Sequence, residues 1–209
     1  MRSLADSLSQ ALRLLPRGGP VCVALSGGLD SWVIALLLRR LGYAVHGLSL
    51  VTGIPGYCEA DRVQQLSARF LMPLEFVPAS LEAMEAALPR FLTATRTPIY
   101  NLHPVSKLLL AEAASVRQIP FVVTGDAADQ VFRCERDCDL LPLTQACFAH
   151  CSVGLVTPFL APEVRALCVQ PDPGKKLLRA LAAELGLPPI PKRPTLVPGE
   201  SIQIGRAHV

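Results

Sequence analysis

The chain has 209 residues, of which 51% are hydrophobic and 18% charged, and its formal net charge is +3. This composition excludes a chain that is disordered over most of its length, because such chains are poor in apolar residues and rich in charge. Its basic residues form no run, so charge alone gives no argument for a nucleic-acid partner. A chain of this length can bury a substantial core.

Residues 1–19 are predicted to contain an amphipathic helix that ends at Pro16 and Gly18, rather than an export signal. Leucines recur every three or four residues from Leu4 to Leu15, and polar residues such as Asp6 interrupt any apolar run. The longest apolar run, Trp32–Leu38, is much shorter than a membrane span. The seven cysteines are an odd number for a disulfide framework. We therefore expect a cytoplasmic protein without a membrane partner.

Short β-rich runs then alternate with helical segments. The β-rich runs are largely apolar, as in strands covered on both faces: Val21–Leu25, Ala44–Val51, Leu74–Val77 and Phe121–Thr124. The predicted helices between them are Trp32–Leu41, Glu59–Phe70, Leu81–Leu88 and Val105–Gln118. The alternation predicts an α/β fold, an open parallel sheet with helices on both faces, in which ligands bind at the carboxyl ends of the strands.

The C-terminal part is predicted to be mainly helical. Residues 126–170 carry five of the seven cysteines and are interrupted by prolines, and Lys175–Leu185 forms a further helix. We expect residues 1–209 to be one domain. Residues 188–209, rich in proline, would be a C-terminal arm that either lies over the site or is partly disordered.

The sequence SGGLDS, residues 26–31, joins the first predicted strand to the helix after it. Gly27 and Gly28 can adopt positive φ and let bare backbone approach a ligand, and the first N–H groups of a helix lack partners within it. Such a unit is typical of a phosphate site, although a strand–helix turn without a ligand is the alternative. Asp30 would repel phosphate unless Mg²⁺ lay between them. The loop is not a Walker P-loop, because no Gly-Lys-Ser/Thr follows.

Three motifs in this order resemble the PP-loop ATP pyrophosphatases, and among them the asparagine synthetases. They are SGGLDS, VVTGDAADQVF (Val122–Phe132) and KKLLRALA (Lys175–Ala182), with weaker matches at PFL (158–160) and KRP (192–194). The resemblance implies a PP-loop fold of the HUP, Rossmann-like type. It also implies that ATP is cleaved to AMP and pyrophosphate, which activates a carboxylate or carbonyl oxygen for attack by a nitrogen nucleophile.

The resemblance also implies roles for single residues. Those expected to bind ATP or its pyrophosphate follow predicted strands: Leu25, Ser26, Gly27, Gly28, Asp30, Ser31, Val51 and Gly125. Asp30 and Asp129 would hold Mg²⁺. Lys175, with Asp126 as its catalytic partner, would stabilise negative charge at the pyrophosphate or the acyl centre.

The sequence departs from the asparagine synthetase pattern in several places. Asp126 replaces a glutamate that is one methylene longer, Gln130 replaces a second acid, and Val156 and Ala161 replace charged residues beside PFL. No glutaminase domain is expected, so ammonia would come from a separate nitrogen-donating subunit. Otherwise the nucleophile would be an amine of the substrate or of a carrier protein, or a sulfur. We expect a small-molecule or peptide acyl substrate and leave an oligomer open.

Four cysteines form two pairs spaced i, i+4: Cys134 with Cys138, and Cys147 with Cys151. Each pair would share one face of a helix. Two facing pairs would supply four thiolates for Zn²⁺ or an iron–sulfur cluster. The alternative is that these cysteines are small buried apolar side chains.

The main expectation is formation of an amide or related C–N bond, with two alternatives. Some PP-loop enzymes adenylate a tRNA base and insert sulfur, and Cys58, in the turn after the second strand, would be a candidate sulfur carrier unless it is only a partly buried loop thiol. A nucleic-acid partner is expected only under that alternative, because the sequence has no basic, aromatic-rich RNA module. The third reading is a nucleotide-binding subunit without catalysis.

Overall fold

The computed structural model describes residues 3–99, 101–132, 140–168, 170–172 and 174–191. One parallel sheet of five strands crosses these residues in the order β3-β2-β1-β4-β5. The strands are β1 (Val21–Ala24), β2 (Val45–Val51), β3 (Leu74–Pro78), β4 (Phe121–Val123) and β5 (Gly154–Val156). The predicted α/β class and the four predicted strands are confirmed. The order reverses at β1, so the carboxyl ends of β1 and β4 border the crevice where ligands of such sheets bind.

Strand β5 is a correction to the sequence prediction, which treated residues 126–170 as helical. It pairs with β4 in parallel, with Phe121 opposite Gly154 and Val123 opposite Val156. Three residues are too few to display a period of two. The strand therefore forms because it can pair with the free edge of β4, and the local sequence gives no signal that predicts it.

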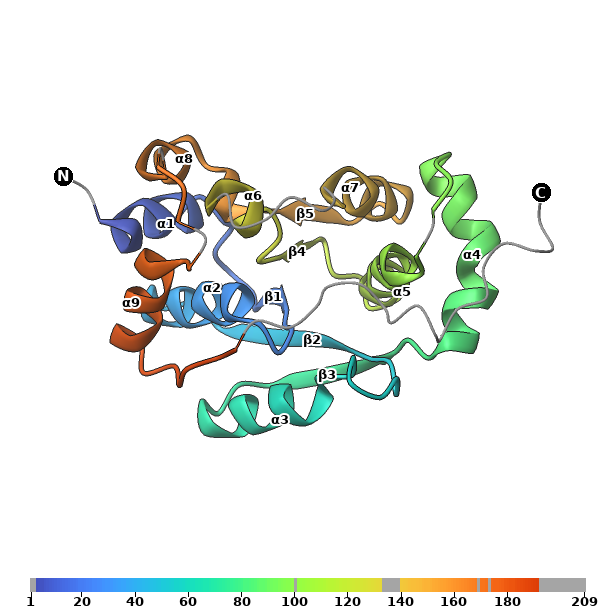
Figure 1. Ribbon diagram of the computed structural model, residues 1–209, viewed down its shortest axis with the longest axis horizontal. Coiled ribbons are helices and arrows are strands. Elements are labelled where there is room, and N and C mark those ends of the chain that lie inside the picture. The colour runs from blue at the N-terminus through green and yellow to red at the C-terminus, as the bar shows by residue number, and fades with distance from the viewer. Residues whose placement is uncertain (1–2, 100, 133–139, 169, 173, 192–209) are drawn as a thin grey trace.

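Helices cover both faces of the sheet (Figure 1). They are α1 (Leu4–Leu12), α2 (Leu29–Arg40), α3 (Ala60–Arg69), α4 (Leu81–Thr95), α5 (His103–Val116), α6 (Ala128–Phe132), α7 (Leu141–His150), the 3₁₀ helix η1 (Pro158–Leu160), α8 (Pro162–Leu167) and α9 (Lys176–Glu184). Within the described residues each helix is too short or too polar to cross a membrane.

Alternation along β1 divides the core between the two faces. Val21 and Val23 pack with the apolar sides of α1, α2, α8 and α9. Cys22 points the other way and packs with residues of α5 and α7, such as Ala111 and Phe148. Figure 1 shows the same division, with α1, α2, α8 and α9 on one side of the view and α4, α5 and α7 on the other. Both faces of the sheet are therefore covered, which explains why its strands are largely apolar.

Prolines in the C-terminal part begin helices rather than break them. Pro142, Pro158 and Pro162 stand in the first turn of α7, η1 and α8. At that position proline's missing N–H has no partner within the helix and its fixed φ suits helical geometry.

Helix α4 does not end at Leu88 as predicted but continues through Pro89 to Thr95. Phe91 is fully buried and packs in the same cluster as Met84 and Ala87, on the face they share. Burying an aromatic ring stabilises the helix by an amount that offsets the hydrogen bond lost at Pro89.

This continuation of α4 predicts an unequal effect of two neighbouring substitutions. Phe91→Ala should lower the free energy of unfolding by about 3–5 kcal/mol, because it leaves a cavity between α4 and α5. Leu92→Ala, at a side chain that is 40% exposed, is the matched control and should change it little. Urea unfolding of both variants checks this, and equal losses would contradict the assigned packing.

Candidate functional site

The loop of residues 26–31 leads from β1 into α2 and is held in shape by its own polar groups. The Ser26 N–H donates to Ser31 Oγ at 3.1 Å, and the Gly28 N–H donates to Ser26 Oγ at 3.1 Å. The indole of Trp32, fully buried, donates to the Ser26 carbonyl oxygen at 2.8 Å. Gly28 is the N-cap of α2 and supplies no side-chain cap. The start of α2 therefore faces the strand ends without a capping side chain, as an anion site requires.

The glycines of the site are needed for close approach rather than for positive φ. Neither Gly27 nor Gly28 has a positive φ, so that part of the expectation is wrong. A Cβ on Gly27 would lie 2.7 Å from the carboxyl carbon of Glu59, and one on Gly125 would lie 2.7 Å from the Ser31 backbone nitrogen. Glycine at these positions lets the end of β4 and the loop after β2 approach the start of α2.

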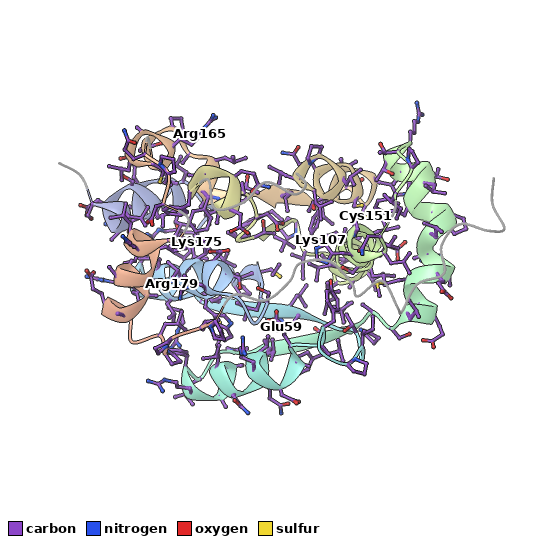
Figure 2. The ribbon with its side chains drawn as sticks, viewed as in Figure 1. Glu59, Lys107, Cys151, Arg165, Lys175 and Arg179 are labelled. Atoms are coloured by element: carbon purple, nitrogen blue, oxygen red, sulfur yellow. The ribbon has the colours of Figure 1, made fainter. Side chains whose placement is uncertain are left out.

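An ion-paired triad joins the predicted catalytic lysine to the two predicted Mg²⁺ ligands. Lys175 Nζ donates to both carboxylate oxygens of Asp30 at 2.7 Å and lies 2.9 Å from Asp129 Oδ1. Asp30 stands in the first turn of α2, Asp129 in α6, and Lys175 at the N-cap of α9. Figure 2 shows Lys175 on the α9 side of the site and Lys107 on the α5 side. Parallel strands thus bring distant motifs to one edge of the sheet.

Burial and charge act against each other in this triad. Burial raises the pKa of Asp30 above its ordinary value, and the Lys175 ammonium opposes that shift without cancelling it. Burial lowers the pKa of Lys175, but the Asp30 and Asp129 carboxylates overcome this and hold it above its ordinary value. Lys175 therefore stays charged at neutral pH and neutralises the two acids.

The two carboxylates fit the expected Mg²⁺. Asp30 and Asp129 both approach one ammonium group within 3 Å, so their oxygens converge on a single cation position. Within the described part of the chain no group of three or more His, Cys, Asp or Glu side chains could hold a metal. Mg²⁺ bound here would take its remaining ligands from water and phosphate, which is its usual habit.

Asp126 has a different partner from the one predicted. Its two carboxylate oxygens accept hydrogen bonds from Lys107 Nζ at 3.0 and 3.2 Å, and Lys175 pairs instead with the acids of the triad. Lys107 lies on α5, and sequence reasoning did not single it out. The signal that could have identified Lys107 is its charge in a mainly apolar helix, between two residues that are buried, Ser106 and Leu108.

The segment 57–59, after β2, forms another wall of the site. Glu59 Oε2 accepts a hydrogen bond from the Gly27 N–H at 2.9 Å. The Tyr57 hydroxyl is hydrogen-bonded to His103 Nδ1 on α5. Cys58 lies half-buried between these two anchored side chains.

The environment of Cys58 favours its thiolate. Burial acts to raise the pKa of Cys58, but hydrogen bonds from backbone groups of Ala60, Gly53 and Thr52 lower it below its ordinary value. Burial has the opposite consequence at His103, whose pKa falls to about 4. His103 is therefore neutral at physiological pH, and Cys58 is more readily ionised than an ordinary cysteine.

A cavity of about 510 Å³ lies over the strand ends, within the range of about 300–1,000 Å³ usual for ligand pockets. Six predicted nucleotide-binding residues line it: Leu25, Ser26, Gly28, Asp30, Ser31 and Gly125. Gly27, which Glu59 covers, and Val51 do not line it, although both neighbours of Val51 do. Tyr57 and Glu59 line the cavity, whereas Cys58 between them does not.

Two predictions fall partly outside the described residues. Cys134 and Cys138 lie there, so the four-thiolate site stays a prediction. Their expected partners are free thiols: Cys147 on α7 is buried, which raises its pKa to about 12, and Cys151, the C-cap of α7, is half-buried. The predicted arm is described only to Pro191, which lines the cavity.

Comparison with known proteins agrees with this geometry. Residues 3–151 match the family model for asparagine synthase, which is more than half of the chain. The chain belongs to the asparagine synthase family of PP-loop ATP pyrophosphatases. Members of this family are ATP-using enzymes.

Several relatives of this asparagine synthase family chain have names that refer to the thiolation of tRNA. The tRNA-specific 2-thiouridylase MnmA of Dichelobacter nodosus is 28% identical over 194 residues, 85% of this chain and 51% of that protein. Cytoplasmic tRNA 2-thiolation protein 1 of Bos taurus is 44% identical over 71 residues, 31% of this chain and 20% of that protein. The chain spans about half or less of the length of these relatives.

A solved structure from Methanocaldococcus jannaschii, described as a predicted subunit of tRNA methyltransferase, has a TM-score of 0.49 and 21% identity to this chain. The likeness covers 79% of this chain and 75% of that one.

The triad predicts that Lys175 is needed for stability. Lys175→Met leaves the half-buried carboxylates of Asp30 and Asp129 without their cation, which should lower the free energy of unfolding by about 1–3 kcal/mol at pH 7.5. Without Lys175 the pKa of Asp30 in the folded chain, already raised, would rise further. At every pH above the pKa that this carboxyl has in the unfolded chain, its ionisation would therefore favour unfolding. The loss should therefore shrink as pH falls toward 4.5.

Urea unfolding at both pH values measures this effect. Lys176→Met is the matched control, because Lys176 is the exposed neighbour. A loss at Lys175 that is no larger than that at Lys176, or one that grows in acid, would contradict the triad.

Proposed function

We propose that the chain uses ATP and Mg²⁺ to adenylate a carbonyl oxygen of a tRNA base, and that a sulfur nucleophile then displaces AMP. The observation that carries the proposal is the Cys58 thiol, with its lowered pKa, between two residues that line the ATP cavity. The names of relatives, which are tRNA 2-thiolation proteins, support the same choice. Amide formation, expected from the motifs, has no comparable support beside the cavity.

The loop and the triad would serve the first step. The pyrophosphate of ATP would lie against the N–H groups of residues 26–31 and the start of α2. Asp30 and Asp129 would hold Mg²⁺, which neutralises phosphate charge when bound. Lys175, next to both acids, would stabilise charge on the departing pyrophosphate, because a buried ammonium acts strongly where water is excluded.

Lys107 and Asp126 would serve the substrate side of the cavity. Their ion pair connects α5 to the end of β4, where both residues line the cavity. Lys107 would stabilise charge on the α-phosphate while the carbonyl oxygen attacks it, and Asp126 would orient the Lys107 ammonium. This assigns the two lysines to opposite ends of the bound triphosphate.

Cys58 would serve the second step as a persulfide, loaded by an external sulfur donor. Its terminal sulfur attacks the activated carbon, so a C–S bond forms while the C–O bond to AMP breaks and AMP leaves with the electron pair. An external thiol then attacks Cys58 Sγ and forms a disulfide with it, while the S–S bond to the base sulfur breaks and leaves that sulfur on the base. A second thiol, such as the other thiol of dithiothreitol, reduces this disulfide and restores Cys58. A thiolate attacks more readily than a thiol, so a lowered pKa suits this role.

The chemistry is tested with the purified chain, ATP, Mg²⁺, total tRNA and a persulfide donor with dithiothreitol. Mass spectrometry of digested tRNA should reveal a thiolated nucleoside, and AMP should form with tRNA present. Cys58→Ser should reduce thiolated nucleoside at least about 100-fold but leave the pyrophosphate released in a single turnover within about twofold, because adenylation releases pyrophosphate without sulfur, whereas AMP leaves only in the second step. Cys151→Ser, at another half-buried cysteine, is the matched control.

Two results would overturn this proposal. One is AMP formation with carboxylic acids and an amine but not with tRNA, which would support the amide-forming reading. The other is full thiolation by Cys58→Ser, which would remove Cys58 from the reaction.

The metal assignment predicts a separate effect. Asp129→Asn keeps the Lys175–Asp30 pair but removes one Mg²⁺ ligand, so pyrophosphate release should fall at least about 100-fold while the fold persists. Circular dichroism and a pyrophosphate assay check both. Asp61→Asn, an exposed acid in the first turn of α3, should leave release unchanged. Normal pyrophosphate release by Asp129→Asn would refute the metal role.

A further inference from the structure

The Glu59 carboxylate lies directly on the PP-loop. Its Oε2 accepts the Gly27 N–H at 2.9 Å, and a Cβ on Gly27 would come within 2.7 Å of its Cδ and Oε1. Arg62 Nη1 lies 3.9 Å from Glu59 Oε1 and 3.5 Å from the Gly27 carbonyl oxygen, to which it donates. The Glu59 carboxylate thus lies against the loop at Gly27, where no side chain separates it from the backbone.

A carboxylate and a phosphate offer a loop N–H the same kind of acceptor, an anionic oxygen. Both anions cannot take the Gly27 N–H at once, because one N–H serves one close acceptor and two anions in contact repel each other. A pyrophosphate that approaches this loop therefore encounters a competitor supplied by the chain itself.

The competitor also fixes the position of Cys58. The segment 57–59 is anchored at one end by Glu59 on the PP-loop and at the other by Tyr57 on His103 of α5. Between these anchors Cys58 does not line the cavity, although both neighbours do. Loss of the Glu59 contact would free one end of the segment and allow the thiol to turn toward the cavity.

We infer that Glu59 occupies the anion site of the PP-loop in the nucleotide-free protein, and that the pyrophosphate of ATP displaces it and releases the segment that carries Cys58. This inference rests on the proposed function, because it takes ATP to be the ligand and Cys58 to be the nucleophile. Glu59 is then a positioning residue: it keeps the thiol out of the cavity until a nucleotide is bound.

Binding of inorganic pyrophosphate with Mg²⁺, measured by isothermal titration calorimetry, tests the competition. Glu59→Gln has the same shape but no charge, so it should bind pyrophosphate about five- to tenfold more tightly than the wild type, because a neutral amide is a weaker competitor for the N–H. Glu85→Gln, at an exposed position on α4, removes the same charge far from the loop and should bind like the wild type. A residue with a merely structural role would weaken binding when changed.

Alkylation of Cys58 by iodoacetamide, followed by mass spectrometry of its peptide, tests the release. Pyrophosphate should raise the rate several-fold in the wild type, whereas Glu59→Gln should react fast without it. Wild-type binding that Glu59→Gln does not strengthen, or a Cys58 rate that pyrophosphate leaves unchanged, would overturn the inference and leave the proposed function standing. If neither protein bound pyrophosphate or ATP, the proposed function would fall first.

Discussion

The site depends on one interaction, the Lys175 ammonium between the carboxylates of Asp30 and Asp129. Two half-buried acids this close would repel each other and lose part of their hydration, so a cation between them stabilises the fold. The cation is supplied by Lys175, the N-cap of α9, which lies 145 residues after Asp30 in the sequence. The same pairing therefore pins the C-terminal part of the chain against the start of α2 and completes the site.

The positions of the loop and of Asp129 were predictable because each follows a strand end, whereas Lys175 was singled out only by the resemblance of its motif. The SGGLDS loop follows β1 and Asp129 follows β4, and adjacent parallel strands end at the same edge. The partner of Asp126 was not predictable, because which lysine reaches it depends on the packing of α5 rather than on any spacing. Strand β5 and the continuation of α4 past Pro89 were missed for a related reason: both exist through contacts with distant elements.

The sequence also overstated how open the PP-loop is. Bare N–H groups suggested a vacant anion site, yet those of Ser26, Gly27 and Gly28 all have partners, supplied by Ser31, Glu59 and Ser26. Partly buried backbone donors are rarely left unpaired, so a chain without its ligand provides substitutes. If ATP is the ligand, as proposed, it would exchange hydrogen bonds at this loop rather than simply add them, and its net affinity would reflect the difference.

This exchange offers a physical account of how one fold can host different second steps. Under the proposed function, the PP-loop, the two carboxylates and Lys175 would contact only the triphosphate, which is the same whichever oxygen is adenylated. The nucleophile would then be selected by the neighbouring walls, which are the segment 57–59 after β2 and the Lys107–Asp126 pair between α5 and β4. In that case the Cys58 thiol, next to Glu59 on the loop, would connect the choice of nucleophile to the binding of ATP. Adenylation would precede attack, because Glu59 would hold the segment that carries Cys58 until the pyrophosphate displaced it.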